Sequence, residues 1–571
     1  MTESKFILTK PRDSIEIHMP DGRVITGPRG NTLEGFFSVL LELERQSIVG
    51  AVVNSELREL TFPLEMDANV APVTMETADG ARIYRRSLTF LLEVAFENLF
   101  PDVELRIDHS VSSGGFFCHV FRHAPLSNAE LDQLSSAMSS LVQQNLQFKR
   151  SQVPLQEAID YFTAKGEVNK VRLLSYRRKE FLVLYSLLEH RDYHHGYMVP
   201  STGYLKWFGL TRMGTGFVLS YPRRFAPTAI QPLPDSPKLL NTFLQYGNWL
   251  ERLGIDNVAA LNDAIAAGRI REVILVSEAL HEQRIIEIAS QIAQNRESLR
   301  VVLISGPSSS GKTTFSKRLS VQLISQGLSP FALEMDNYFV DREKTPRSEN
   351  GDYDYESLGA LDRVLLNTHI QQLISGEQVQ LPRFDFKAGS GFPGDTVRLQ
   401  PGQLIILEGI HGLNPGLLPK LAPDQFFRVY VSALTQLNLD KHNRISTTDT
   451  RLLRRIVRDA AERGYSALQT LQRWESVRMG EKNHIFPFQE NADIMFNSAL
   501  AYELSALKPV VEPLLRQVPY GCQEYIEAKR LLAFLEWFLP INTELIPDNS
   551  ILREFLGGSI LHDFRVWKNN S

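Results

Sequence analysis

Apolar and polar residues alternate with different periods in successive parts of the chain. Residues 14–22 (SIEIHMPDG) alternate with the period of a strand and end in a Pro-Asp-Gly turn, and residues 24–26 continue beyond it, which predicts a hairpin. Residues 33–43 have helical spacing, and Val52 begins a further strand. A hairpin, a helix and short strands within about 65 residues predict a small β-grasp module.

The following part of the chain predicts a mixture of helices and strands. Residues 87–96 have helical spacing. Ser127 and Glu130 form a capping box ahead of an amphipathic helix that reaches about Gln147. Residues 172–188 contain strand-like segments.

A cluster of prolines marks the next boundary. Proline removes a backbone donor and resists both helix and sheet, so we expect a linker here. Residues 238–296 have a mostly helical pattern and are expected to form a helical connector. The prolines stand at positions 222, 227, 232, 234 and 237.

From Arg300 onward, short apolar runs alternate with helical stretches, and the chain after about Ala499 is helical again. Short apolar runs separated by helices are typical of a parallel α/β sheet that is covered on both faces. The predicted buried strands are VVLIS (301–305), FALEM (331–335), QLIILE (403–408) and FRVYVS (427–432).

The composition of the 571-residue chain is that of an ordinary globular protein, with 43% apolar and 22% charged residues. Its formal net charge of −5 argues against a whole-protein affinity for nucleic acid or anionic membrane. Cys118 and Cys522 are the only cysteines, so we expect no disulfide framework and a cytoplasmic location. The start has no secretion-signal pattern, and no apolar run reaches about 18 residues, so we expect no membrane partner.

Residues 306–313 (GPSSSGKT) fit the GxxxxGK[ST] pattern of a phosphate-binding loop. Glycines let backbone N–H groups approach phosphate oxygens, and the positive end of a helix beginning near Lys312 attracts the anion. The Lys312 ammonium suits the β- and γ-phosphates, and the Thr313 hydroxyl suits Mg²⁺. The alternative is a strand-to-helix turn that binds no ligand.

Two acidic residues follow predicted strands. Asp336 comes directly after FALEM, and Glu408 ends QLIILE. Ligands gather beyond the carboxyl ends of parallel strands, so these acids and Thr313 are expected to converge near one Mg²⁺. One acid would hold the metal through water and the other would orient or deprotonate an attacking hydroxyl. Alternatively, each acid caps the helix that follows it.

Residues 449–463 (DTRLLRRIVRDAAER) predict a helix with one basic face. Arginines on a shared face repel each other unless anions neutralise them, and a triphosphate is a suitable anion. The alternative is a solvated face paired with Asp449, Asp459 and Glu462. The arginines at i, i+3, i+4 and i+7 are Arg451, Arg454, Arg455 and Arg458.

Residues 300–500 resemble the phosphoribulokinase/uridine kinase family, and within it the uridine–cytidine kinases. The resemblance implies a P-loop α/β kinase with a parallel sheet and a mobile lid. It rests on the order and spacing of GPSSSGKTT (306–314), MDNYF (335–339), YDYESLGALD (353–362), PRFDF (382–386), LEGIHGL (407–413) and DTRLLRRIVRDAAERG (449–464).

The same resemblance implies roles for single residues. Asp336 would receive the proton of a sugar 5′-hydroxyl, with Lys312 and Arg454 also catalytic. Thr313, Asp336 and Glu408 would hold Mg²⁺. The residues implied to bind ATP (or GTP) are Gly306, Pro307, Ser308, Ser309, Ser310, Gly311, Lys312, Thr313, Thr314 and Arg458. The residues implied to bind the substrate are Asp354, Phe384, Phe386 and Arg451, with Asp354 on the ribose hydroxyls.

One departure from the family concerns the base. Uridine–cytidine kinases carry a histidine shortly after the [YF]DF segment that reads the pyrimidine, whereas here Phe386 is followed by Lys387, Ala388 and Gly389. Phe384 and Phe386 are suited to sandwich a base. The group that reads the edge of the base stays open.

Residues 13–221 resemble the amino-terminal half of threonyl-tRNA synthetase, a TGS domain followed by an editing domain. The resemblance rests on IEIHMPDGR (15–23), IYRRSLTFLLEVAFENLFPD (83–102) and YHHGYMVPSTGYLKWFGL (193–210). The editing family's His-x-x-x-His and Cys-x-x-x-His positions hold Arg86, Phe90, His194 and Met198. The resemblance therefore implies a retired editing fold that is either a regulatory or RNA-sensing module or a structural appendage. His194 and His195 are expected to be a polar surface pair, since the sequence offers no evident partner ligands for a metal.

The predicted function is ATP-dependent transfer of the γ-phosphoryl group to the 5′-hydroxyl of a ribonucleoside, uridine or cytidine. The alternatives are a kinase of another small alcohol such as a sugar phosphate, an NTP-loaded protein that regulates RNA contacts, and an aminoacyl-tRNA deacylase, which the missing His and Cys residues disfavour. RNA contact through the amino-terminal half and a homo-oligomer stay open. The predicted domains are 1–70 (TGS-like), 71–225 (editing-like α+β), 226–297 (linker and helical connector), 298–500 (P-loop kinase-like) and 501–571 (helical segment).

Overall fold

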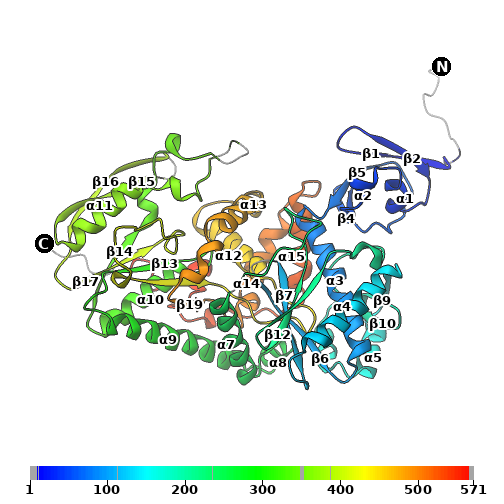
Figure 1. Ribbon diagram of the computed structural model, residues 1–571, viewed down its shortest axis with the longest axis horizontal. Helices are drawn as coiled ribbons and strands as arrows, with labels where there is room; N and C mark the ends of the chain where they lie inside the picture. The colour runs from blue at the N-terminus through cyan, green and yellow to red at the C-terminus, as the bar shows by residue number, and fades with distance from the viewer. Residues whose placement is uncertain are drawn as a thin grey trace, which may run out of the picture. The chain divides into compact units, whose positions relative to one another are not determined.

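The structure of the protein is a computed structural model, shown in Figure 1. It holds mixed and parallel sheets together with many helices, so the chain is an α/β protein, as predicted. The described residues are 10, 12–111, 114–234, 236–347, 351, 353–385 and 388–564.

The chain folds into two compact units, and neither is continuous in sequence. Two short segments from the second half of the chain belong to the first unit. The domain boundaries given above stay predictions. Unit 1 comprises Met1–Pro234, Leu439–Arg444 and Val518–Trp537, and unit 2 comprises Asp235–Asn438, Ile445–Gln517 and Phe538–Ser571.

Unit 1 begins with a five-stranded mixed sheet and two short helices. These are β1 (Ser14–His18), β2 (Val24–Pro28), α1 (Leu33–Phe37), α2 (Glu42–Arg45), β3 (Ile48–Val53), β4 (Glu56–Arg58) and β5 (Ala68–Thr74). The predicted hairpin of β1 and β2 is confirmed, and β5 runs parallel to β1. The helix predicted over residues 33–43 is interrupted, because the Ser38 N–H turns back to the Gly35 carbonyl and ends α1.

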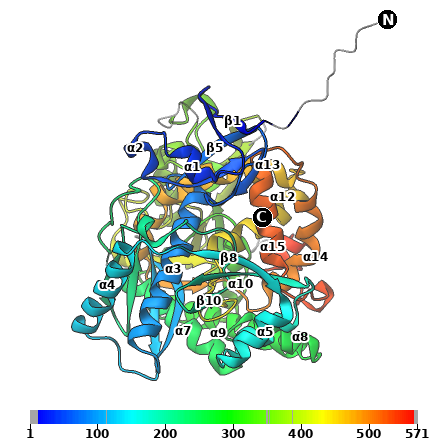
Figure 2. The same ribbon diagram turned by 90° about the vertical axis from the view of Figure 1, so that its right-hand side faces the viewer.

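The second part of unit 1 packs helices against two antiparallel sheets. The elements are α3 (Ala78–Leu99), β6 (Glu104–Val111), β7 (Gly115–Phe121), α4 (Asn128–Gln143), β8 (Lys149–Pro154), α5 (Leu155–Ala164), α6 (Val168–Ser175), β9 (Phe181–Leu187), β10 (His190–Asp192), β11 (Gly209–Met213) and β12 (Gly216–Ser220). The Ser127–Glu130 capping box opens α4, as predicted. Apolar residues of α3, α4 and the sheet β11-β12-β7-β6 form one buried core, and Figure 2 shows α3 and α4 side by side. The end of α6 occupies the start of the strand-like stretch 172–188, so that prediction holds only for β9.

The two later segments are integral to unit 1. The backbone N–H of Ile107 in β6 donates to the carbonyl of Lys441, 2.8 Å away. Helix α15 (Glu524–Leu535) carries Glu527, whose carboxylate accepts a hydrogen bond from Arg82 of α3 at 2.7 Å. Residues far apart in sequence therefore complete this unit.

Unit 2 begins with α7 (Pro237–Leu253), α8 (Val258–Ala266) and α9 (Ile270–Gln294), which confirms the helical pattern of residues 238–296. Helix α7 begins with Pro237. Proline is favourable at this position because the backbone N–H that it lacks would make no hydrogen bond within the helix. The other elements of unit 2 outside its main sheet are α10 (Lys312–Ser325), the 3₁₀ helix η2 (Met335–Tyr338), α11 (Arg363–Ile374), the hairpin β15 (Gln378–Asp385) and β16 (Ser390–Arg398), α12 (Thr447–Glu462), α13 (Ala467–His484), α14 (Glu503–Arg516) and α16 (Arg553–Leu556).

A five-stranded parallel sheet is the centre of unit 2. In spatial order its strands are β14 (Ser329–Glu334), β17 (Gln403–Glu408), β13 (Val301–Ser305), β18 (Phe426–Ser432) and β19 (Ile494–Asn497). The first four confirm the predicted strands. The last was not predicted, because its four residues are too short a run to stand out from the helical pattern around it. Helices α10 and α9 cover one face and α11 covers the other (Figure 1).

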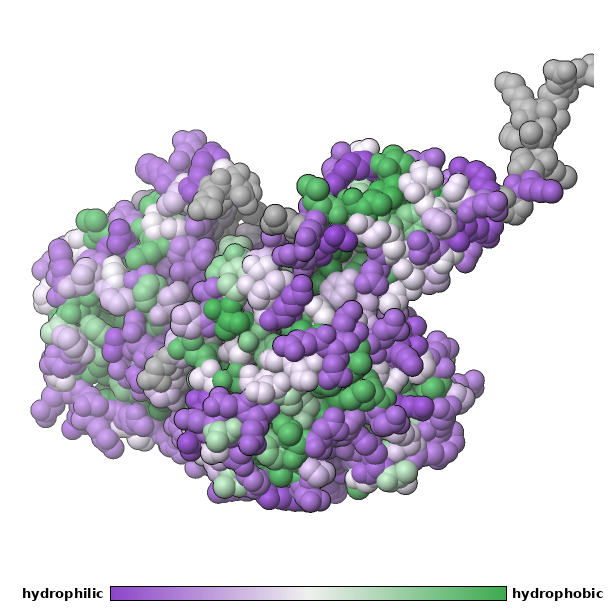
Figure 3. All heavy atoms as spheres, turned by 45° about the vertical axis from the view of Figure 1, so that its right-hand side comes forward, coloured by the Kyte–Doolittle hydropathy of each residue, from purple (hydrophilic) through white to green (hydrophobic). Residues whose placement is uncertain are grey.

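Large apolar side chains that reach the surface are spread along the chain, from Val24 to Ile560. On the face seen in Figure 3 they lie in small groups among hydrophilic residues. Within the described part of the chain, none of the helices combines the length and the hydropathy needed to cross a lipid bilayer.

Candidate active site at the phosphate-binding loop

The glycine-rich loop follows β13 in the middle of the parallel sheet and leads into α10. A Cβ atom on Gly306 would lie 1.9 Å from the carbonyl oxygen of Val431, so only glycine lets the loop approach β18 this closely. Gly311 has a φ of +84°, in the left-handed region that favours glycine. As in any helix, the backbone N–H groups of the first turn of α10 have no hydrogen-bond partner within the helix, and here they lie next to the loop.

Lys312, Thr313 and Glu408 meet at the carboxyl end of the sheet, as predicted. The Lys312 ammonium donates to the carbonyls of Gly306 and Pro307 at 3.0 and 3.1 Å. The Thr313 hydroxyl donates to Oε1 of Glu408 at 2.9 Å. Burial, opposed by the charge of Lys312, raises the pKa of Glu408 to about 7, and burial lowers the pKa of Lys312.

Asp336 lies in η2, directly after β14, with its side chain accessible to solvent. Many protein atoms nevertheless surround the carboxylate, and this loss of hydration raises its pKa against the opposing charge of Lys312. The Asp336 charge in turn acts on the pKa values of both Lys312 and Glu408. The hydroxyl of Thr313 and the carboxylates of Asp336 and Glu408 are hard oxygen donors, so this set of donors fits Mg²⁺.

The arginines of α12 divide into two classes. Arg451 and Arg454 are buried, and each makes a two-pronged pair with a carboxylate from another helix. Arg451 pairs with Glu481 of α13, with one Nη–Oε distance of 2.7 Å. Arg454 pairs with Glu503 of α14 at 2.6 and 3.2 Å. The anions that neutralise these two arginines are therefore protein carboxylates, but not those that the alternative had named; of those, Asp459 pairs with Arg455 and Arg458.

Arg455 and Arg458 are only partly buried. The Arg455 guanidinium donates to the Ser308 hydroxyl in the phosphate-binding loop at 2.8 Å. Burial, reinforced by the neighbouring charge of Arg463, lowers the pKa of Arg458, and the Arg458 charge acts on the pKa of Lys312. These two side chains are the arginines of α12 best placed to meet an anion at the loop.

Of the residues predicted to bind the substrate, Arg451 lies on α12, whereas Asp354 and Phe384 lie on other segments. Asp354 is half-buried, and its carboxylate lies 3.2 Å from Nε2 of His484 at the end of α13. Phe384 in β15 packs against Phe339, with 5.8 Å between ring centroids. Phe386 lies outside the described residues.

Three acids and a histidine near this site were missed by sequence reasoning. Burial and the charge of Glu481 raise the pKa of Glu356 to about 7. Glu481 accepts a hydrogen bond from the Ser308 backbone N–H at 3.0 Å. His411 of the LEGIHGL segment is buried, and its ring centroid lies 6.3 Å from that of His484. Glu356 and His411 stand in segments that the sequence had marked, YDYESLGALD and LEGIHGL, whereas Glu481 does not.

Glu554 of α16 is the third missed acid, and it contacts the loop helix directly. Its carboxylate accepts hydrogen bonds from the backbone N–H and the hydroxyl of Thr314, at 3.1 and 2.9 Å. A Cβ on Gly311 would lie 2.6 Å from Cγ2 of Ile551, so the segment before α16 also lies against the loop. A single glutamate in a helical tail carries no sequence signal for such a contact.

The former ligand positions of the editing fold are filled by packing. Phe90 is buried against Phe148 and His194, with ring centroids 5.9 and 5.2 Å apart. Met198 is also buried, and the Arg86 guanidinium donates to the Tyr197 carbonyl. The expectation of a surface pair at His194 and His195 is wrong for His194, which is buried because α3 packs over it.

These observations can be set beside proteins already known. Residues 301–504 match the model of the Phosphoribulokinase / Uridine kinase family. The stretch contains the loop, both strand-end acids and α12. The sequence of this part of unit 2 is therefore kinase-like and of a nucleotide-binding type.

The amino-terminal half is similar to threonyl-tRNA synthetases, as the sequence resemblance indicated. The chain is 31% identical over 205 residues to threonine–tRNA ligase 2 of Bacillus subtilis. The aligned stretch covers 36% of this chain and 32% of the ligase. It is also 31% identical over 173 residues to the threonine–tRNA ligase of Acidithiobacillus ferrooxidans, covering 30% and 27%. The chain thus spans about a third of the length of these relatives.

Among solved structures, a possible uridine kinase from Bacillus stearothermophilus is similar with 22% identity and a TM-score of 0.24, covering 35% of this chain and 89% of that one. A D-glycerate 3-kinase from Cryptococcus neoformans is similar with 17% identity and a TM-score of 0.27, covering 37% and 89%.

The two classes of arginine predict different effects of substitution. Arg454→Ala leaves Glu503 buried without its partner, so we expect a loss of about 3–5 kcal/mol of unfolding free energy. Arg458→Ala removes a 3.7 Å pair with the buried Asp459, which keeps Arg455 and Arg463 as partners, so stability is expected to change by less than about 1 kcal/mol while nucleotide binding weakens about tenfold. Denaturant unfolding and nucleotide titration of both variants check this. Equal stability losses would show that the division between the arginines is wrong.

The Glu554 contact predicts that this carboxylate opposes binding of an anion at Thr314. In Glu554→Gln, removal of the charge is expected to tighten MgATP binding about three- to fivefold, as for a partly screened charge contact. Glu544→Gln, on an exposed turn of the same tail, is the matched control and should leave the affinity unchanged. Unchanged or weaker binding in Glu554→Gln contradicts the prediction.

Proposed function

We propose that the protein is an ATP-dependent kinase that transfers the γ-phosphoryl group to the 5′-hydroxyl of a ribonucleoside, uridine or cytidine. The proposal is carried by the contact between Thr313 and Glu408 beside Lys312, which gathers a phosphate-binding loop and a strand-end acid at one edge of the sheet. The family match over residues 301–504 and the name of that family support the choice of reaction.

In the proposed mechanism the loop binds the triphosphate through its backbone N–H groups. The acceptor oxygen forms a bond to the γ-phosphorus while the bond from that phosphorus to the bridging oxygen breaks, leaving ADP. Asp336 takes the proton of the acceptor hydroxyl, and Lys312 and Arg458 stabilise the charge on the phosphoryl oxygens. Mg²⁺, held by Thr313, Glu408 and Asp336, would supply further neutralisation of phosphate charge.

The acceptor side of the proposal rests on Asp354. Because its carboxylate lies 3.2 Å from Nε2 of His484, this histidine can fix its orientation toward two neighbouring hydroxyls of a ribose. Phe384 offers an aromatic face for a base. Arg454, which was predicted to be catalytic, is enclosed by Glu503 and Ser498, so we propose that it positions α12 and does not contact the nucleotide.

A small alcohol such as a sugar phosphate is a second candidate acceptor. The segment after Phe386 (Lys387, Ala388, Gly389) lacks the base-reading histidine of uridine–cytidine kinases, which favours this alternative. GTP as an alternative donor to ATP, an RNA contact through the amino-terminal half and a cytoplasmic location are further parts of the proposal. An assay against a panel of nucleosides and sugar phosphates distinguishes the acceptors.

Lys312→Ala tests the loop. This substitution removes a charge whose interaction strengthens as the γ-phosphoryl group departs, so we expect the phosphorylation rate to fall about 10²-fold or more. Steady-state kinetics with the best acceptor of the panel, together with circular dichroism to verify folding, checks this. Near-normal turnover by a folded variant excludes a catalytic role for the loop.

Asp336→Asn tests the proposed base. The substitution keeps the size of the side chain and removes its charge and basicity, so turnover should fall about 10²- to 10⁴-fold while ATP affinity stays within about threefold. If Asp336 only caps a helix turn, asparagine should replace it with no effect on rate or melting temperature. Measuring kcat, nucleotide affinity and melting temperature on this variant separates the two, and an unchanged kcat places the activation of the acceptor elsewhere.

A further inference from the structure

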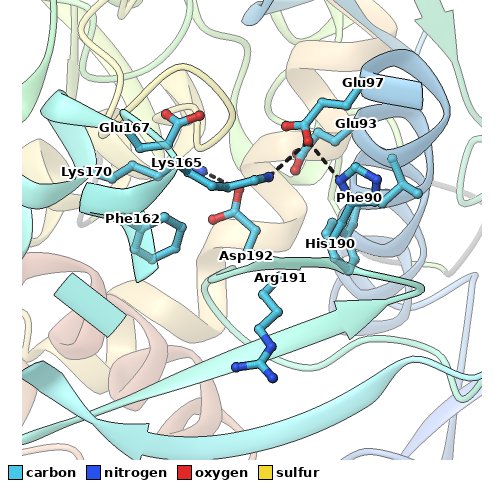
Figure 4. A pocket seen from close by; sticks show the side chains of 11 residues that line it. Phe90, Glu93, Glu97, Phe162, Lys165, Glu167, Lys170, His190, Arg191 and Asp192 are labelled. Atoms are coloured by element: carbon cyan, nitrogen blue, oxygen red, sulfur yellow. Dashed lines mark hydrogen bonds and ion pairs between the residues drawn. The ribbon is translucent and has the colours of Figure 1, made fainter. Parts of the chain in front are cut away.

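Unit 1 holds a buried cluster of carboxylates and imidazoles that plays no part in the proposed reaction. Glu93 comes from α3, and Asp192 ends β10, with His194 two residues later. Figure 4 shows Glu93 and Asp192 lining one pocket together with Lys170 of α6. The segment Leu439–Arg444, which also belongs to unit 1, brings His442 to the same place.

The donor atoms of this cluster have the spacing of a metal coordination sphere. Nδ1 of His442 lies 3.3 Å from Oε2 of Glu93 and 3.2 Å from Oδ2 of Asp192. Nε2 of His194 lies 3.7 Å from Oε2 of Glu93. Ligand atoms about 2.0–2.1 Å from a tetrahedral Zn²⁺ are about 3.3 Å from one another. Donor atoms of Glu93, Asp192 and His194 all lie within 4.8 Å of one another, and His442 lies beside the first two of these residues.

Two of the donor atoms lack hydrogen-bond partners within the described residues. They are Oε1 of Glu93 and Nε2 of His194, and each side chain is only 3% exposed. A buried polar atom without a hydrogen-bond partner destabilises the folded protein, and a bound metal ion would give both of these atoms a partner.

The charges around the cluster leave room for a cation. Glu97 pairs with Lys165 at 3.0 Å, and Glu167 pairs with Lys441 at 2.6 Å, so these outer charges cancel. The remaining charges are three carboxylates, one ammonium and the Arg86 guanidinium, which leaves one negative charge when all are ionised. The charged groups of this inner set are Glu93, Asp192, Asp440, Lys170 and Arg86.

We propose that Glu93, Asp192, His194 and His442 form a structural zinc site that fastens the segment Leu439–Arg444 into unit 1. Four protein ligands with no open position are typical of a structural role. Lys170 bonds to Oδ2 of Asp192 and its ammonium lies 3.4 Å from Nδ1 of His442, so it is the outer partner of both ligands and turns away from Nδ1 when a metal binds there. The site uses only His194 of the four former editing positions, so it differs from the ligand set of that fold.

Metal content of the full-length protein tests the proposal. Protein purified without a polyhistidine tag is expected to contain about one zinc ion per chain by plasma mass spectrometry. After chelation and reloading with Co²⁺, the protein should show the intense visible absorption of tetrahedral cobalt with nitrogen and oxygen ligands. A folded wild-type protein that contains no zinc and takes up neither Zn²⁺ nor Co²⁺ overturns the proposal, and the buried charge is then balanced by a proton on Glu93.

Two variants identify the ligands. His442→Asn is expected to lose the bound zinc and the cobalt spectrum. The matched control is His190→Asn, on β10 and paired with Glu97 outside the donor set, which should retain both. Retention of zinc and of an unchanged cobalt spectrum in a folded His442→Asn protein contradicts the proposal. If His442→Asn does not fold, the cobalt spectrum of the wild-type protein decides.

Discussion

The arrangement of the candidate active site depends on two arginines that are charged and almost completely removed from water. A buried guanidinium without a carboxylate partner is too costly to persist. The ion pairs of Arg451 with Glu481 and of Arg454 with Glu503 therefore hold α12 against α13 and α14. Arg451 and Glu481 both also bond to Ser308, and Ser498, which contacts Arg454, donates to the Ser310 carbonyl. The conformation of the phosphate-binding loop is therefore tied to three helices through ion pairs.

Burial acts on the acids and bases around the loop in opposite directions. It raises the pKa values of Glu408 and Glu356 and lowers those of Lys312 and Arg458. In each case the charged form is disfavoured because few water molecules reach it. A bound phosphate with its metal ion would supply both signs of charge at once, so the site is electrostatically complete only with a ligand. This is the behaviour expected of groups held ready for phosphoryl transfer.

The sequence predicted the strands, turns and caps that depend on neighbouring residues. It missed the side-chain contacts between residues that are far apart along the chain. Four of the five strands of the parallel sheet, the loop, the capping box at Ser127 and the first hairpin are local patterns, and the structure confirms them. The meeting of Thr313 and Glu408 could also be predicted, since parallel strands end at one edge. The carboxylates that neutralise α12, the contact of Glu554 and the partners of His194 come from helices and loops whose placement no local pattern gives.

The interleaving of the two units has a consequence for how the chain folds during its synthesis. Residues 1–234 leave the ribosome first, yet unit 1 also needs Leu439–Arg444 and Val518–Trp537. Until those segments emerge, the acids around Glu93 and Asp192 lack His442, and Arg82 lacks Glu527. Closing such long loops is slow and entropically unfavourable. Unit 1 therefore stays incomplete until Val518–Trp537 has been translated, so its folding is delayed relative to the synthesis of most of its residues.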